Sequence, residues 1–371
     1  MELSIIDTQK AIKQIKYEFE KDLSDSLDLL RVSAPKFVKT NTGIQDDLAN
    51  TCTSVKFNIP DCNYDVEIVH SLAKWKRIAL QRYDIPVHTG IYTDMDAIRK
   101  DERLDFMHSV YVDQWDWEQR INPEDRNDSF LIQTVGKIYN AMRLTESKIH
   151  NSIRCMQRIR NEPYPELSHS HRCLPDYITY IHSEELEEMY PNMTPKEREN
   201  EITKKHGAVF LMGIGYPLKN CKPHDIRAFD YDDWSTPVET YRTYDSMLRA
   251  TYDINFDMTK SPKRQFHGLN GDILVWNDVT QCAFELSSMG VRVNTESLVN
   301  QAEIMHSDVP ITSPYHMMVA TNEIPLSIGG GIGQSRLCMY LLKKHHIGEV
   351  QVSEWPDNMI DECKKNGVHL L

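Results

Sequence analysis

The sequence lacks the features that mark membrane-spanning and secreted chains. No stretch approaches the ~18 uninterrupted apolar residues that a membrane span requires. The first residues contain no basic segment followed by an apolar run, so we expect no signal peptide. The eight cysteines are scattered without a Cys-x-x-Cys pair, as reduced structural thiols are. These absences predict a soluble cytoplasmic protein with no membrane partner.

An excess of basic charge is also missing. The formal net charge is −13 at pH 7, which argues against a general nucleic-acid-binding surface. With 371 residues, of which 40% are hydrophobic, the chain can build one large domain or two ordinary ones around a sizeable core. The composition favours an enzyme that acts on small molecules.

A glycine-rich stretch near the C-terminus carries the first functional signal. Residues 329–331 are consecutive glycines, Gly333 follows, and a helical pattern begins at Ser335. We therefore expect a glycine-rich turn that opens a helix, a common setting for phosphate or nucleotide. Neither the Walker A loop nor the dinucleotide fingerprint fits these residues. The spacing resembles motif 3 of class II aminoacyl-tRNA synthetases, ending at Arg336; the alternative is a helix entry with a solvated arginine.

The N-terminal region predicts a helix followed by an extended segment. Asp7 can cap the helix, whose apolar positions at helical spacing are Ile12, Ile15, Phe19, Leu23 and Leu30. Pro35 ends any helix and starts an extended segment over residues 32–38. This order resembles motif 1, the dimer-forming element of class II synthetases. An ordinary helix-to-strand corner is the alternative.

Two strands joined by a charged loop resemble motif 2 of the same synthetases. Residues 90–99 predict the first strand and residues 108–118 the return strand. Side chains alternate between faces in a strand, so Gln114 and Asp116 share one face. The resemblance implies that Arg99, near the end of the first strand, binds the α-phosphate of ATP.

The remaining chain predicts several further elements. A long helix covers residues 127–160, Thr194 opens a capped helix that stops at Gly207, and strands and helices follow, predicted over residues 208–214, 272–276, 282–287, 295–306 and 313–321. Hairpin strands are expected at 55–59 and 65–69, followed by a helix from 72 to 83 with Ser71 as its N-cap. His169, His171 and Cys173 lack a fourth ligand at zinc spacing, so a solvated loop is preferred there.

Five segments resemble the ammonia-dependent asparagine synthetases, the aspartate–ammonia ligases. The segments are 70–77 (HSLAKWKR), 108–118 (HSVYVDQWDWE), 230–235 (DYDDWS), 268–276 (GLNGDILVW) and 284–290 (FELSSMG). With the glycine-rich stretch, the resemblance runs from about residue 43 to residue 355. It implies an α+β fold with a class II synthetase-like antiparallel, mixed β-sheet flanked by helices. We expect a single catalytic domain over residues 1–371, an insertion at 238–267 and a homodimer.

The resemblance also implies the reaction. L-aspartate and ATP would give β-aspartyl-adenylate and pyrophosphate, and ammonia would then give L-asparagine and AMP. Arg99 would hold the α-phosphate and the β-carboxylate, while Arg336 would stack on adenine. Other nucleotide-binding residues implied are Asp232, Asp272, Glu285, Gly331 and Gly333. Acids inside apolar strands are costly unless paired or metal-bound, so Asp272 and Glu285 are expected to hold Mg²⁺; salt bridges to Arg292 or a neighbour are the alternative.

Further residues are expected to bind aspartate. Its α-ammonium needs acceptors, which Asp46 and Asp116 can supply, and its α-carboxylate needs donors, expected from Lys76, Ser71 and Ser288. Arg292 is also expected at the substrate, and Gln114 at the adenylate. An unpaired carboxylate such as Asp46 can take the proton that ammonium must lose. The catalytic residues expected are therefore Arg99, Gln114 and Asp46.

Three other functions fit the sequence less well. An aspartyl-tRNA synthetase needs an anticodon-binding module, and only one helix precedes the first expected motif. A non-catalytic synthetase paralogue with a binding role would not need Arg99, Asp272, Glu285 and Arg336, which are all present. A glutamine-dependent synthetase is disfavoured because the chain begins Met1-Glu2, without an N-terminal nucleophilic cysteine.

Overall fold

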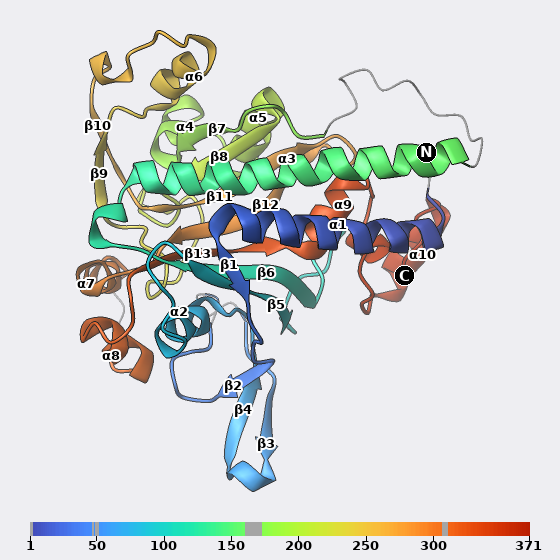
Figure 1. The fold of residues 1–371 in the computed structure, drawn as a ribbon, viewed down its shortest axis with the longest axis horizontal. Coiled ribbons are helices and arrows are strands. Elements are labelled where there is room, and N and C mark those ends of the chain that lie inside the picture. Colours follow the sequence, from blue (N-terminus) through green and yellow to red (C-terminus); the bar gives the residue numbers. More distant parts are fainter. Residues whose placement is uncertain (1–2, 47, 49–51, 160–172, 306–310) are drawn as a thin grey trace.

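An eight-stranded mixed β-sheet forms the centre of the protein (Figure 1). The computed structural model describes residues 3–46, 48, 52–159, 173–305 and 311–371. The strands, in spatial order, are β1 (Leu29–Arg31), β5 (Gly90–Ile98), β6 (Tyr111–Arg120), β13 (Ser327–Gly333), β12 (Cys282–Val291), β11 (Asn270–Asn277), β8 (Ala208–Met212) and β7 (Thr179–His182). From β5 to β8 all neighbours are antiparallel, whereas the outer strands β1 and β7 are parallel to theirs. The expected α+β architecture is confirmed.

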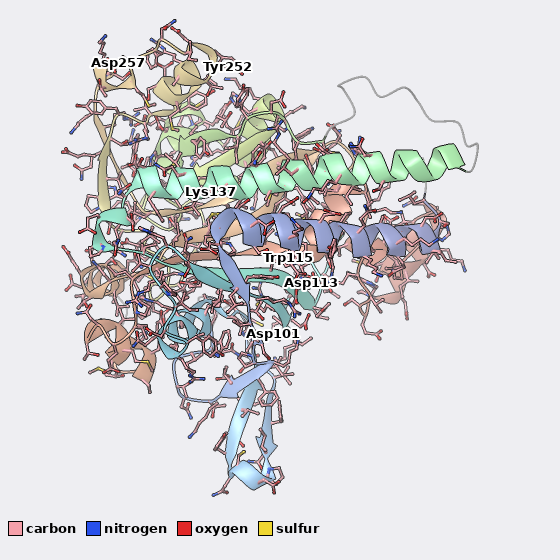
Figure 2. All side chains as sticks on the ribbon, viewed as in Figure 1. Asp101, Asp113, Trp115, Lys137, Tyr252 and Asp257 are labelled. Carbon is pink, nitrogen blue, oxygen red and sulfur yellow. The ribbon has the colours of Figure 1, made fainter. Side chains whose placement is uncertain are left out.

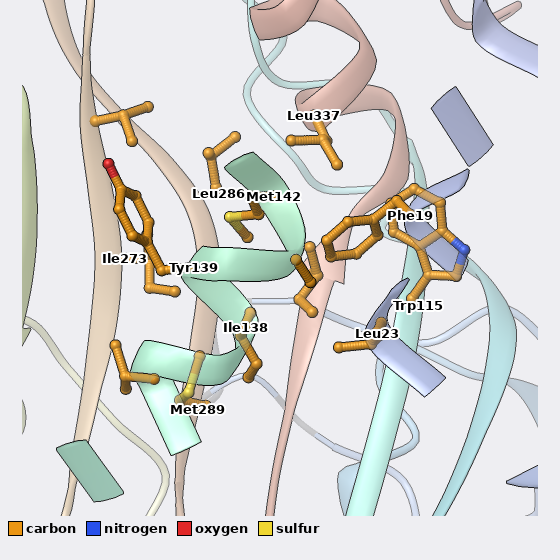
Figure 3. Packing of buried hydrophobic residues seen from close by; sticks show 14 of the residues in the cluster. Phe19, Leu23, Trp115, Ile138, Tyr139, Met142, Ile273, Leu286, Met289 and Leu337 are labelled. Carbon is orange, nitrogen blue, oxygen red and sulfur yellow. The ribbon is translucent and has the colours of Figure 1, made fainter. Parts of the chain in front are cut away.

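Two long helices cover one face of this sheet. Helices α1 (Ile5–Leu27) and α3 (Asp128–Ile159) run side by side across it (Figure 1). Figure 3 shows Phe19 and Leu23 of α1 next to Trp115 of β6, with Ile138 and Met142 of α3 in the same core. The rings of Phe19 and Trp115 lie 4.6 Å apart between centroids. The opposite face of the sheet is therefore the one available for a site.

The N-terminal helix differs from its prediction at both ends. Ser4 is the N-cap, and its hydroxyl accepts a hydrogen bond from the backbone of Asp7, so Asp7 lies inside the first turn. The helix ends at Leu27, which leaves Leu30 in strand β1. The segment expected to be extended, residues 32–38, lies mostly between two short strands, because β1 stops at Arg31 and β2 (Phe37–Lys39) begins after Pro35.

A small three-stranded sheet projects from the main body (Figure 1). It consists of β2, β4 (Tyr64–Ile68) and β3 (Lys56–Ile59), joined by the short helix η2 (Pro60–Cys62), and confirms the predicted hairpin. Helix α2 (Ala73–Arg82) follows. Its formal N-cap is Leu72 rather than Ser71, although the Ser71 hydroxyl accepts from the backbone N–H of Ala73 at 3.1 Å.

The middle of the chain largely follows its predictions. Thr194 and Glu197 form the expected capping box of α5 (Pro195–His206), and Gly207 ends that helix. Strand β8 stops at Met212, two residues earlier than expected. The remaining elements here are α4 (Ser183–Met189) and η3 (Pro123–Asp125). His169 and His171 lie outside the described residues, and every cysteine whose side chain is described is free.

Residues 237–267 leave the main sheet and return to it. Strands β9 (Pro237–Thr240) and β10 (Arg264–His267) pair antiparallel at the base, and α6 (Tyr244–Tyr252) and η5 (Met258–Lys260) lie beyond them. Tyr252 and Asp257 lie at the far tip, away from β6 (Figure 2). Tyr252 is exposed, whereas Lys263 lies over the ring of Tyr241. That this segment is an insertion stays a prediction.

The C-terminal third contains the correction that matters most for the site. The glycine-rich stretch is not a turn but the central strand β13, and helix α9 (Gln334–Leu341) begins directly after Gly333. Glycine has a low strand propensity, but β13 lies between the long strands β6 and β12 and bonds to both. The other elements are α7 (Thr295–Ile304), α8 (Pro314–Ala320), η6 (Ile347–Glu349) and α10 (Asp357–Lys365).

Candidate active site

A cavity of about 310 Å³ opens on the sheet face opposite α1 and α3. Strand alternation separates the two faces as predicted, because Trp115 and Trp117 enter the core while Gln114 and Asp116 line the cavity. All but one of the expected site residues line this cavity: Asp46, Ser71, Lys76, Arg99, Gln114, Asp116, Asp232, Glu285, Ser288, Arg292, Gly331, Gly333 and Arg336. The exception is Asp272, which is buried on neighbouring strand β11. Their individual roles stay predictions.

Gly331 and Gly333 of β13 line the cavity floor, and Gly329 lies next to it on the same strand face. A Cβ atom at Gly329 would lie 1.9 Å from Glu118 Oε2, and one at Gly331 would lie 2.3 Å from Gln114 Oε1. At Gly333 the nearest atom would be Cβ of Arg336, at 3.1 Å. The missing side chains therefore make room for protein side chains that lie across the strand. We call the two ends of this floor the Gly329 end, with Lys76, Asp116, Glu118, Asp232 and Arg292, and the Gly333 end, with Arg99, Glu285 and Arg336.

The Gly329 end contains a buried arginine held by two carboxylates. Arg292 donates to Glu118 through Nε at 2.9 Å and through a terminal nitrogen at 2.7 Å, and its other terminal nitrogen bonds to Asp232. The three side chains are at most 5% exposed. Burial lowers the pKa of Arg292, but Glu118 and Asp232 outweigh it and raise that pKa well above its usual value. Burial raises the pKa of Asp232, although Arg292 opposes the change.

Lys76 is the second buried cation at this end. Its Nζ bonds to Asp116 and donates to the carbonyls of Trp117 at 2.9 Å and Gly330 at 3.1 Å. Burial lowers the pKa of Lys76, and the charges of Asp116 and Glu118 oppose that effect. Asp116 Oδ2 is buried without a hydrogen-bond partner in the described part of the chain. Lys76 thus joins α2 to the cavity floor, and Asp116 keeps one free acceptor.

Asp46 lies beside the cavity on the loop before β3. It is only 2% exposed, and burial raises its pKa while the nearby Lys74 ammonium opposes that shift. Its Oδ1 accepts the backbone N–H of Leu48 at 2.9 Å. A buried carboxylate with a raised pKa is a suitable proton acceptor at neutral pH.

Arg99 is placed at the Gly333 end by the pairing of β5 and β6. It follows β5 directly, and its backbone N–H donates to Val110 at 2.8 Å. Its guanidinium contacts only the carbonyl of His70, through Nε at 3.4 Å and a terminal nitrogen at 3.2 Å, among the contacts of the described residues. Most of its donors are therefore available to an incoming anion, in the planar arrangement that suits phosphate and carboxylate.

A β-bulge aligns the other side chains of the Gly333 end. The register between β11 and β12 slips by one residue, so that Ser287 faces Ile273 and Glu285 faces Leu274. Strict alternation would put Glu285 and Ser288 on opposite faces; the bulge brings both to the cavity, and the Ser287 hydroxyl donates to Gly331. Arg336 donates to the carbonyl of Glu285 at 3.2 Å, and its side chain is 22% exposed.

Asp272 pairs with an arginine that the sequence patterns did not single out. Arg227 donates to Asp272 Oδ2 at 2.5 Å and lines the cavity. Burial raises the pKa of Asp272 to about 7; Arg227 opposes the shift and the charge of Glu285 adds to it. The alternative of a salt bridge holds for Asp272, but with Arg227 rather than Arg292. Among the described residues no group of three or more His, Cys, Asp or Glu side chains is arranged to hold a metal ion.

Two further charged residues were missed, of which Arg227 lines the cavity and Glu118 is buried beneath it. Glu118 lies two positions after Asp116 on the same strand face, so the period-two pattern that located Gln114 and Asp116 could have found it. Arg227 precedes the acidic run at 230–233, and only the folded structure brings it to Asp272.

No helix in the described ranges is both long and apolar enough to cross a membrane.

The architecture and cavity define the fold class first: this is the fold of class II aminoacyl-tRNA synthetases. Asparaginyl-tRNA synthetases from Entamoeba histolytica and Pyrococcus horikoshii, each solved with asparaginyl-adenylate, superpose with TM-scores of 0.60 and identities of 13% and 14%. The comparisons cover 94% of this chain and 66% and 70% of those chains, respectively. Identities this low establish the fold alone.

The sequence relatives are more specific, and the chain belongs to the aspartate–ammonia ligase family. Residues 6–367 match that family's profile. Aspartate–ammonia ligases from Pediococcus pentosaceus and Parabacteroides distasonis are 44% and 46% identical over 370 residues, covering all of this chain and 96% of each relative. The relative from Malacoplasma penetrans is 45% identical, with 99% of it covered. The chain is therefore an enzyme of the ligase class that forms a C–N bond.

Proposed function

We propose that the chain amidates L-aspartate with ammonia in an ATP-dependent reaction that passes through β-aspartyl-adenylate. An oxygen of the β-carboxylate attacks the α-phosphorus of ATP and pyrophosphate leaves. The ammonia nitrogen then attacks the acyl carbon, and AMP leaves with the attacking oxygen. The observation that carries this proposal is that buried paired charges and partly exposed arginines line one and the same cavity.

The Gly333 end suits the nucleotide. Arg99 has unused donors for the α-phosphate and for the β-carboxylate that attacks it. Arg336 lies over Gly333, and its partly exposed guanidinium can stack on adenine. A preorganised donor of this kind contributes a factor of about 10²–10³ to catalysis.

Asp272 and Glu285 fit a divalent cation. Asp272 Oδ1 is buried without a hydrogen-bond partner among the described residues, and the two carboxylates repel each other. Carboxylate oxygens together with phosphate oxygens are the donors that Mg²⁺ prefers. A bound Mg²⁺ would neutralise negative charge on the phosphates. Arg227 would remain beside Asp272 as the second positive charge.

The Gly329 end suits aspartate. The free acceptor of Asp116 can receive the α-ammonium, and Gln114 lies beside it on the same strand face. Ser71 and Ser288 line the cavity as hydroxyl donors for the α-carboxylate, near Lys76 and Arg292. Lys76 already makes three bonds, so its contribution is mainly the charge that it adds to the pocket. Asp232 acts through Arg292.

Asp46 is our candidate base for the second step. Ammonium must lose a proton before its nitrogen can attack, and the buried carboxylate of Asp46 can accept that proton. Replacing Asp46 by Asn is expected to spare aspartate-dependent ATP–pyrophosphate exchange while lowering asparagine formation. Loss of exchange would instead assign Asp46 to substrate binding.

We also propose a homodimer in the cytoplasm. Leu30 on the edge strand β1 is 62% exposed, and Phe37 and Phe57 on the small sheet are 42% and 40% exposed. Their exposure supports contact with a second copy. Sedimentation equilibrium of the purified chain, giving twice the chain mass, tests the dimer.

One assay tests the proposed reaction against its alternatives. AMP release from ATP and L-aspartate is measured with ammonium, with glutamine or with tRNA as the acceptor. We expect ammonium-dependent AMP release. Its absence would contradict the proposal, tRNA-dependent release would select an aspartyl-tRNA synthetase, and the glutamine reaction would reveal a second nitrogen donor.

A further inference from the structure

A buried chain of three charged or polar side chains lies behind Asp46. Lys74 of α2 pairs with Asp230 at 2.5 Å between Nζ and Oδ2, and His316 of α8 contacts the same oxygen through Nε2 at 3.0 Å. Lys74, Asp230 and His316 are 5%, 6% and 5% exposed. None of the three was expected at the site. Burying such a set is costly, which indicates a role beyond packing.

Lys74, at one end of this group of three side chains, contacts the residue next to Asp46. Lys74 Nζ donates to the carbonyl of Gln45 at 3.3 Å, while also pairing with Asp230. Burial lowers the pKa of Lys74, but the charges of Asp230 and Asp46 outweigh it and raise that pKa. One buried ammonium therefore interacts with two carboxylates, Asp230 and Asp46.

We propose that Lys74, Asp230 and His316 are positioning residues that set the charge of Asp46 for the ammonia-dependent step. The inference rests on the proposed role of Asp46 as base. His316 holds Asp230, Asp230 holds the ammonium of Lys74, and the remaining positive field of Lys74 acts on Asp46. The side chains of Lys74, Asp230 and His316 do not themselves contact aspartate or ATP.

The charges around Asp46 decide the expected direction of each change. Burial raises the pKa of Asp46, Lys74 and Arg99 lower it, and Asp230 raises it. Tyr231 and Tyr315 also face this group of charges, but burial raises the pKa of both phenols, so they stay neutral. Removing Lys74 must therefore raise the pKa of Asp46, and removing the charge of Asp230 must lower it.

The test compares two variants with opposite expected shifts. Asparagine formation is measured against pH at one fixed, saturating ammonium concentration for wild type, Lys74→Met and Asp230→Asn. We expect the acidic limb of the pH–rate profile, where activity falls as Asp46 is protonated, to move up by about one pH unit in Lys74→Met. In Asp230→Asn it should move down by a smaller amount. Because all proteins receive the same ammonium, its own ionisation cancels from the comparison. Unshifted limbs, or shifts in one common direction, would overturn the inference.

A milder pair of variants covers the case in which a buried charge change prevents folding. His316→Leu removes the donor to Asp230, so Asp230 depends more on Lys74 and the acidic limb moves up slightly. His316→Gln keeps an N–H donor and is expected to restore the wild-type limb. A limb that responds equally to both substitutions would overturn the proposal.

His224 offers a matched control outside the cavity. Its Nε2 contacts the buried Glu199 at 3.0 Å, and Glu199 also pairs at 2.8 Å with Lys196, so a histidine and a carboxylate are paired here as at Asp230, but with an exposed lysine. His224→Leu is expected to lower thermal stability without moving the acidic limb. An equal shift in this control would mean that loss of buried charge, not position behind Asp46, causes the effect.

ATP–pyrophosphate exchange separates this inference from the proposed function. The variants are expected to keep exchange, because adenylate formation does not need Asp46 as base. If Asp46→Asn keeps full asparagine formation, the proposed base is wrong. If Asp46→Asn loses asparagine formation but the acidic limbs of Lys74→Met and Asp230→Asn do not move apart, only the positioning role of Lys74, Asp230 and His316 is wrong. Loss of exchange in folded Lys74→Met or Asp230→Asn would also overturn the inference.

Discussion

At the Gly329 end of the cavity floor the charged side chains are buried and paired with one another, whereas at the Gly333 end they remain partly exposed. Arg292 and Glu118 are 3% and 0% exposed. Arg336 and Glu285 are 22% and 36% exposed, and their nearest charged atoms lie 3.6 Å apart. The two ends share a sheet face and a glycine strand, so the difference lies in how each charge is neutralised.

The difference indicates a division of labour. Paired buried charges are held in place before any substrate arrives, which suits the recognition of a small zwitterion such as aspartate. Partly exposed charges with unused donors suit a polyanion that brings its own charge. On this account, substitutions at the Gly329 end affect stability strongly, and substitutions at the Gly333 end affect the nucleotide reaction.

The largest expected effect comes from removing one charge of the buried set. Glu118→Gln leaves Arg292 with a single charged partner and is expected to cost about 3–5 kcal/mol of unfolding free energy. Glu285→Gln, the matched change at the other end, is expected to cost less than about 1 kcal/mol because the pair is partly solvated. Urea unfolding measures both, and equal losses would remove the contrast between the ends.

The next effect concerns the arginine with free donors. Arg99→Lys keeps the charge but loses the planar fork, so ATP–pyrophosphate exchange is expected to fall about 10²-fold with little change in stability. The exposed Arg103 on the same loop supplies the control, and Arg103→Lys is expected to behave as wild type. Similar exchange rates in the two variants would remove Arg99 from the phosphate site.

The glycine floor provides a finer test of the two ends. Gly331→Ala must displace the amide of Gln114. Overpacking of this kind costs about 1–3 kcal/mol, and we expect this cost to appear as a lower kcat/KM for aspartate. At Gly333 the added methyl group would meet Arg336 at 3.1 Å, so Gly333→Ala is expected to raise KM for ATP only a few-fold. Steady-state kinetics with each substrate varied decide whether the two effects separate in this way.

The smallest effect expected is on the requirement for metal. Asp272→Asn is expected to raise the Mg²⁺ concentration for half-maximal exchange about ten-fold, because one of two carboxylate ligands is lost. Asp278→Asn in the exposed turn between β11 and β12 is the control and should leave this concentration unchanged. An unchanged requirement in Asp272→Asn would assign that acid to Arg227 alone.

Local patterns in the sequence predicted much of this site because the patterns are short-range. The period-two alternation of β6 put Gln114 and Asp116 on the cavity face, and the strand before Arg99 and its return strand have nearly the predicted limits. The family resemblance added Asp46 and Arg292, which no periodicity would select. Their presence at one cavity agrees with that resemblance.

What could not be predicted depends on contacts between distant segments. The bulge on β12 brings Glu285 and Ser288 to the cavity together, which strand alternation alone does not predict, because β11 and β12 pair out of register there. The pairing of Asp272 with Arg227 joins residues 45 positions apart. The glycine stretch looked like a turn because glycine disfavours strands, but hydrogen bonds to both neighbours hold it extended.

The most direct test of the central claim follows the oxygen of aspartate. L-aspartate labelled with ¹⁸O in its β-carboxylate is converted with ATP and ammonium, and the products are examined by mass spectrometry. If the β-carboxylate attacks the α-phosphate, one labelled oxygen leaves in AMP for each asparagine formed. Label in inorganic phosphate, with release of ADP, would mean attack at the γ-phosphate and would contradict the account.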